Sequence, residues 1–166
     1  MSQKIIRYSL HPLPSYRYIP GKGPKDESRK DLPQLHYLDF EAHEYRRSEA
    51  YLYGLDLFNH QYFYEAHEIW EELWHVVGHR SEVGLFLKSL IQLAAFYLKV
   101  EMKEDRPASR LLERVQEAMS YFHALDASFM GMALSPLKMR LALLKEDLEN
   151  QKLILFEPIP LKMDSL

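Results

Sequence analysis

The sequence predicts a single all-α domain, a bundle of about five helices preceded by an extended N-terminal arm. Apolar residues recur at three- and four-residue intervals through most of the chain, which is the period of one helical face. Residues that cap and stop helices punctuate these stretches, and no stretch signals paired strands. At 166 residues the chain has the length of one compact domain.

The composition narrows the class of protein and the kinds of site. With 47% hydrophobic and 27% charged residues, the chain is typical of a globular protein. A net charge of -3 gives no field that would attract phosphate backbones or anionic lipid, so we expect no nucleic-acid or membrane partner. The chain has no cysteine, which excludes disulfides and thiolate ligands. Any metal site must therefore use histidine and carboxylates.

The sequence favours a cytoplasmic location. The N-terminus carries charges where a secretory signal needs a long apolar run, and it has no small-residue cleavage site. The longest apolar stretch, Leu90 to Leu98, contains Gln92 and is about half the length of a membrane span.

Three segments are predicted along the chain: a proline-rich extended arm over residues 1–36, the helical bundle over 37–150, and an extended apolar tail over 151–166. Five of the nine prolines lie in the first 33 residues, where they cannot sustain a helix. The tyrosines of the arm suggest that part of it packs on the bundle or on a neighbouring subunit. A loose N-terminal tail is an equally good interpretation. The C-terminal tail should lie in a groove, either on the bundle or on a partner chain.

The five expected helices form two antiparallel hairpins and a C-terminal helix. The third helix is apolar on nearly every side, so it should be the central, most buried one. Gly78 is suited to end the second helix. Four residues are placed to cap the helices that follow them: Asn59, Ser81, Asp105 and Ser135. The predicted helices cover about residues 37–57 and 61–77, a third that begins after Ser81, then 105–122 and 135–150.

The second predicted helix is the segment with residues suited to chemistry. At about 100° per residue, His67 and Glu71 lie on one face and can meet one metal ion or share a proton. Glu68 lies beside them, and Tyr64 and Trp74 fall on the same arc. His67, Glu68 and Glu71 are therefore the candidate catalytic residues, and His67 and Glu71 are the candidate metal ligands.

Several features limit this interpretation. The segment is not an HExxH zinc motif, because Glu71 stands where a second histidine is needed. The same tetrapeptide recurs at Glu41–Glu44, where Arg47 would repel a cation bound at His43. A histidine at such a position is more often half-buried and hydrogen-bonded, here to Glu71 or to a neighbouring helix, than a metal ligand or a catalytic base. The spacing permits a divalent metal but does not require one.

Two residues of the third predicted helix extend the candidate site. Gln92 lies in an otherwise apolar helix and needs a partner or a water if it is buried. Lys99 follows on the same stripe, which also holds Lys88. Facing the acidic side of the second helix, this stripe would form an electrostatic seam or the floor of a polar pocket. Gln92 and Lys99 therefore join Tyr64 and Trp74 as candidate binding residues.

The second and third predicted helices carry a combined motif. It comprises Phe58-Asn59, Tyr62-Phe63, Glu65, His67-Glu68, Glu71 and Trp74, followed by Leu-Ile-Gln-Leu-Ala-Ala at 90–95. Over about residues 51–122 the chain resembles the small helical family known as domain of unknown function 309. The resemblance implies an all-helical bundle with no established activity, in which the His-Glu motif and Gln92 are the functional features. Where the family has a histidine after the third helix, this chain has Lys99, which would weaken a metal site that used it.

A looser similarity is to tetratricopeptide hairpins. Gly54, Ala66 and Trp70 match the small, small, large pattern by which the paired helices of such repeats touch. Two hairpins are fewer than a repeat scaffold normally needs, so the arm and the C-terminal helix would have to act as caps.

Two functions remain open. The first is a binding or assembly module, acting as a homodimer, whose acidic His/Glu groove recognises a helix, a peptide or a small cationic ligand. The alternative is a hydrolase of an unknown small substrate, with His67 as base, Glu71 orienting it and Glu68 as a second acid or base, with or without a divalent ion. We favour binding because the chain is rich in aromatic residues, has an apolar tail and lacks a complete catalytic constellation. Self-association or a protein or peptide partner is thus expected.

Overall fold

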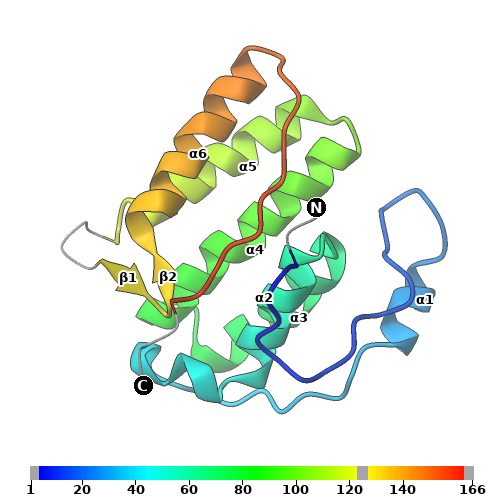
Figure 1. Cartoon of the computed structure of the whole chain (residues 1–166), viewed down its shortest axis with the longest axis vertical. Helices are drawn as coiled ribbons and strands as arrows, with labels where there is room; N and C mark the ends of the chain where they lie inside the picture. Colours follow the sequence, from blue (N-terminus) through cyan, green and yellow to red (C-terminus); the bar gives the residue numbers. More distant parts are fainter. Residues whose placement is uncertain (1–3, 123–126, 163–166) are drawn as a thin grey trace.

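The computed structural model describes residues 4–122 and 127–162 and confirms the all-α architecture (Figure 1). The bundle consists of α2 (Glu49–Asn59), α3 (Phe63–Val77), α4 (Glu82–Glu101), α5 (Asp105–Met119) and α6 (Leu134–Glu149). Short elements accompany it: the helix α1 (Lys25–Lys30), the 3-10 helix η1 (Ala42–Arg47) and the strands β1 (Ser128–Phe129) and β2 (Met132–Ala133).

The central position of α4 agrees with its predicted burial. α3 packs on one part of its surface and α5 on another, and α2 packs on α3. Within the residues that the structure describes, α4 is the one helix long and apolar enough to cross a membrane, but 61% of its apolar stretch is buried inside the protein. Here α4 is the core helix of the bundle.

The first predicted helix, over 37–57, is wrong in its first half. Residues 37–41 are not helical and η1 follows them, so the α-helix begins only at Glu49. Ser48 caps it, because its side chain accepts a hydrogen bond from the Tyr51 N–H. The apolar spacing that predicted this helix rests mainly on Tyr51, Leu55 and Phe58, which all lie in α2, so it did not fix where the helix begins.

The predicted helix caps are only partly correct. Ser81 caps α4 by accepting a hydrogen bond from the Gly84 N–H at 3.0 Å. Gly78 ends α3 with a positive φ of 92°, as expected from its sequence position. The other three caps are wrong, since all three residues lie within helices: Asn59 at the end of α2, Asp105 at the start of α5 and Ser135 in the first turn of α6.

Two small elements contradict the predictions that the arm contains no helix and that the chain contains no paired strands. α1 forms within the arm, because the six residues between Pro24 and Asp31 contain no proline. A minimal hairpin pairs β1 with β2, with Phe129 opposite Met132. Its strands are two residues long, too short to show an alternating pattern in the sequence.

The α2–α3 hairpin closes on a contact between Gly54 and Trp70, as the tetratricopeptide-like spacing predicted. A Cβ atom at Gly54 would lie 2.2 Å from Trp70 Nε1, so only glycine lets the indole approach the α2 backbone this closely. Trp70 is fully buried, and its Nε1 donates a hydrogen bond to the Tyr51 carbonyl at 3.2 Å.

The arm and the tail are both tied to this hairpin by buried polar side chains. Asp56 accepts hydrogen bonds from the N–H groups of Tyr8 and Ser9, at 2.8 and 2.9 Å. Asn59 bonds both the carbonyl and the N–H of Ile159, at 2.9 and 2.8 Å. Figure 1 shows the C-terminal tail running from the end of α6 back along the bundle. Of the two places expected for the tail, it therefore occupies the groove on its own bundle.

Glu65 of α3 is a third buried anchor. None of its side chain is exposed, and its Oε1 accepts a hydrogen bond from the Tyr18 N–H at 2.7 Å. Its Oε2 is buried without a hydrogen-bond partner among the described residues. Burial raises the pKa of the Glu65 carboxyl, and the Tyr18 hydrogen bond opposes this rise.

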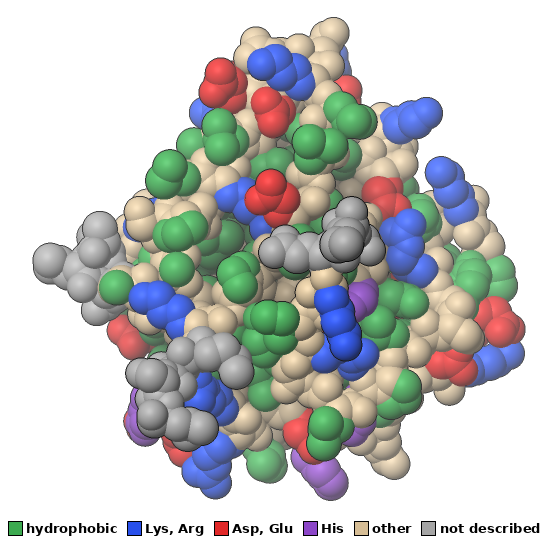
Figure 2. Space-filling model, in the orientation of Figure 1, with side chains coloured by type: hydrophobic (Ala, Val, Ile, Leu, Met, Phe, Trp, Pro, Cys, Tyr) green, Lys and Arg blue, Asp and Glu red, His purple; other side chains and the backbone are tan. Residues whose placement is uncertain are grey.

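Apolar side chains remain exposed on α6 and the tail. Figure 2 shows hydrophobic side chains over the part of the surface that these two elements form. The large exposed ones in α6 and the tail are Met139, Leu143, Leu153 and Leu155. The self-association expected from the sequence stays a prediction.

We expect Gly54→Ala to destabilise the protein by about 1–3 kcal/mol, because the Trp70 ring and its hydrogen bond to Tyr51 must shift. Thermal unfolding followed by circular dichroism measures the effect as a lower Tm. The sign is informative, since alanine for glycine inside a helix normally stabilises by about 1 kcal/mol. A higher Tm for the variant would show that the two helices do not touch at Gly54.

We expect Glu65→Gln to remove a pH-dependent loss of stability. Since the folded-state pKa of Glu65 is raised above its ordinary value of 4.5, the protonated carboxyl favours the folded state, and stability falls as the pH rises through the folded-state pKa. Glutamine keeps an acceptor for the Tyr18 N–H without a charge. Melting curves from about pH 5 to about pH 8 should therefore show a Tm advantage of the variant that grows with pH.

The exposed Glu113 on α5 provides the matched control. Glu113→Gln should leave the pH dependence of Tm as it is in the wild type. A Glu65→Gln variant whose Tm follows that of the wild type at every pH would contradict a raised pKa at Glu65.

Candidate functional site

His67, Glu68 and Glu71 form a cluster on the outer side of α3. His67 Nε2 lies 3.3 Å from Glu71 Oε2, and His67 Nδ1 lies 3.8 Å from Glu68 Oε1. One nitrogen or oxygen from each residue lies within 4.8 Å of the others. The three side chains are 29%, 30% and 43% exposed, so solvent reaches all of them. The i, i+4 spacing brings His67 and Glu71 together as the helical period predicts.

The cluster borders a cleft of about 450 Å³ between α3 and the N-terminal arm. Arg29 and Leu32 line it from the arm. The lining residues of α3 are Glu68, Ile69, Glu71, Glu72 and His75. Three carboxylates therefore share the cleft with one guanidinium, which leaves it with an excess of negative charge.

The arm supplies polar contacts along this cleft. Arg29 Nη2 donates to Glu68 Oε2 at 3.0 Å. The Tyr37 hydroxyl interacts with Glu72, and burial together with this hydrogen bond raises the pKa of Tyr37. Arg29 of the arm and Tyr37 directly after the arm thus each give one of the three carboxylates a partner, while Glu71 faces His67.

Tyr64, a candidate binding residue, lies buried beneath the arm. The ring of Tyr18 packs edge-on against it, with 4.6 Å between the ring centroids. Lys25 Nζ lies 5.7 Å from the centroid of the Tyr64 ring. In this structure Tyr64 therefore holds the arm against α3, one turn before His67.

Trp74 lies near the C-terminal end of α3 and does not line the cleft. It is half-buried, and its ring stacks on His79 with 3.7 Å between the centroids. Its Nε1 is buried without a hydrogen-bond partner among the described residues. The side chain of His75 bonds to His79 at 2.9 Å. His75 also lines the cleft, so this histidine-rich end of α3 adjoins it.

Gln92 and Lys99 are not brought to the His67 cluster. Gln92 lines a different groove, of about 530 Å³, between α4 and α5, together with Lys88 and Arg114. Lys99 pairs with Glu104 at 2.6 Å. The stripe that holds these residues faces α5 rather than the acidic side of α3, so the seam expected between α3 and α4 does not form.

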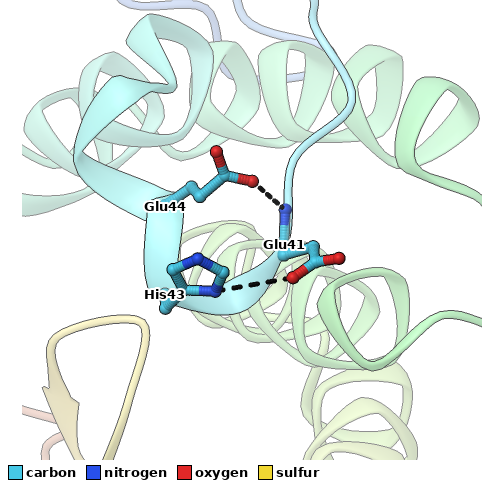
Figure 3. A group of neighbouring side chains, drawn as sticks. All are labelled: Glu41, His43 and Glu44. Atoms are coloured by element: carbon cyan, nitrogen blue, oxygen red, sulfur yellow. Dashed lines mark hydrogen bonds and ion pairs between the residues drawn. The ribbon is translucent and has the colours of Figure 1, made fainter.

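The second copy of the tetrapeptide, at Glu41–Glu44, also gathers potential ligands (Figure 3). His43 Nδ1 lies 3.6 Å from Glu41 Oε2, but these two side chains are 76% and 80% exposed. Figure 3 shows Glu44 turned toward the Glu41 backbone nitrogen. The resulting hydrogen bond lowers the pKa of Glu44, which also pairs with Arg47 at 2.8 Å. This cluster serves to start η1, so the same four residues have a different role there.

Two motif residues turned out to have a role that the sequence did not indicate. Asn59 and Glu65 bind the tail and the arm instead of contributing to a site or a cap. For Glu65 there was a signal, since it lies four residues before the apolar Ile69 and therefore falls on the apolar side of the helix.

Comparison with known proteins agrees with the resemblance seen in the sequence. The family model described as domain of unknown function (DUF309) matches residues 51–111. No curated protein matches the chain. The matched segment runs from the first turn of α2 into α5 and contains the whole His67 cluster, but it ends at Leu111 rather than Phe122. Residues 51–111 are therefore similar to the DUF309 family, and the arm, α6 and the tail lie outside the matched segment.

Proposed function

We propose that this domain is a binding module that holds a divalent metal ion on His67, Glu68 and Glu71. The observation that carries the proposal is that one ligand atom from each of the three lies within 4.8 Å of the others. One imidazole nitrogen and two carboxylate oxygens form a donor set suited to Zn²⁺ or Mn²⁺. Three protein ligands leave a coordination position for water or for a ligand from the cleft.

The charge of the cleft supports the same function. Glu68, Glu71 and Glu72 lie within five residues of one helix, and like charges at such spacings destabilise a helix. Arg29 offsets only part of this charge. A bound dication would relieve the repulsion that remains between the carboxylates.

Burial distinguishes this cluster from the one at Glu41–Glu44. The side chains of His67 and Glu68 are 29% and 30% exposed, whereas those of His43 and Glu41 are 76% and 80% exposed. Ordering exposed side chains around an ion costs more conformational entropy. The cluster on α3 is therefore the better prepared of the two, and we propose metal binding there alone.

Isothermal titration calorimetry of the full chain with ZnCl₂ and MnCl₂ tests the proposal. We expect one ion to bind per chain, because one cluster is prepared to hold it. His67→Ala should weaken the binding at least about 10-fold, and Glu71→Gln should weaken it in the same direction, because each removes a ligand.

His43→Ala is the matched control, since it changes the same residue in the other copy of the tetrapeptide and should leave the affinity unchanged. The proposal is wrong if the wild type shows no saturable binding of either ion. It is also wrong if His67→Ala binds as tightly as the wild type.

A further inference from the structure

α1 rests on the same acidic cluster through Arg29. Arg29 Nη2 lies 3.0 Å from Glu68 Oε2 and lines the cleft beside the cluster. α1 has no extensive packing contact with another helix, and Figure 1 shows it beside the bundle on a loop of the arm. Lys25, over the ring of Tyr64, adds a second cationic contact to α3. Side-chain charge, rather than apolar burial, thus accounts for the contact of α1 with α3.

Arg29 and a metal ion would use the same carboxylate. Glu68 Oε2 accepts the Arg29 hydrogen bond, while Glu68 Oε1 faces His67 Nδ1 at 3.8 Å. A dication held by His67 and Glu68 would lie next to this guanidinium, and two positive charges at such short range repel each other. The Arg29 guanidinium therefore already neutralises the Glu68 carboxylate, which the ion would need as a ligand.

We infer that Arg29 is an internal competitor of the metal ion, and that binding of the ion releases α1 from α3. The inference rests on the proposed function, because it needs an ion at His67, Glu68 and Glu71. The coupling is reciprocal: the Arg29 contact weakens ion binding by the same factor as the ion weakens the contact.

The segment that would move lies between two fixed points. On one side, the Tyr18 N–H is bonded to the buried carboxylate of Glu65. On the other side, Asp31 accepts a hydrogen bond from the Ser15 N–H at 3.2 Å. Within residues 19–30, α1 can therefore detach while Ile19, which packs against the core, and the rest of the arm stay in place.

Hydrogen–deuterium exchange measures this release. The full chain is compared with and without the ion, Zn²⁺ or Mn²⁺, that binds more tightly. In the wild type, the ion should speed exchange of the backbone amides over residues 19–30. Without any ion, Arg29→Ala should show the same fast exchange, because the contact with Glu68 is lost. Calorimetry should show that Arg29→Ala binds the ion about 5-fold or more tightly than the wild type.

Lys30→Ala is the control, because Lys30 pairs with Glu27 within α1 and not with α3. It should leave both the affinity and the exchange as in the wild type. Suppose that the wild type binds the ion, but Arg29→Ala binds it no more tightly or the ion does not change exchange over residues 19–30. Arg29 is then not a competitor of the ion, while the proposed metal site remains supported. If the wild type binds neither ion, the proposed function and this inference both fail.

Discussion

Three polar side chains buried in the α2–α3 hairpin, Asp56, Asn59 and Glu65, determine where the rest of the chain must lie. A buried polar group left without a hydrogen bond costs about 1–3 kcal/mol. The backbone groups of α2 and α3 are already used within the helices, so the partners have to come from elsewhere. They come from the backbone of the arm and of the tail, segments that form no regular structure at those positions. Two extended segments thereby become part of one folded body.

The position of the arm in turn creates the cleft. Because Tyr18 is held by Glu65, the chain that follows runs beside α3 and brings Arg29 and Leu32 to the cleft wall. The motif on α3 is divided between two tasks within about two helical turns. Glu65 points inward and holds the chain together, whereas His67 and its two carboxylates point outward to a surface that solvent reaches. Structural and candidate functional residues therefore alternate along the same few positions.

The sequence predicted the features that depend on interactions between residues close together in the chain, and it missed those that depend on distant residues. The helical period predicted the bundle, the central place of α4 and the meeting of His67 with Glu71, since these depend on residues close in the chain. Asn59 was misread as a cap because its true partner, Ile159, lies 100 residues away. Gln92 was placed beside the cluster because a stripe on an apolar helix does not reveal which neighbour it faces. α1 was missed because the prolines around it concealed a proline-free stretch of one and a half turns or so.

Diffraction data from crystals grown with MnCl₂, recorded where manganese scatters anomalously, locate the ion itself. A metal-binding role for α3 predicts an anomalous peak at about 2.0–2.2 Å from a ring nitrogen of His67, with carboxylate oxygens of Glu68 and Glu71 completing the protein ligands. A peak at Glu41 and His43 instead, or no peak beside α3 in crystals that contain the ion, would contradict it.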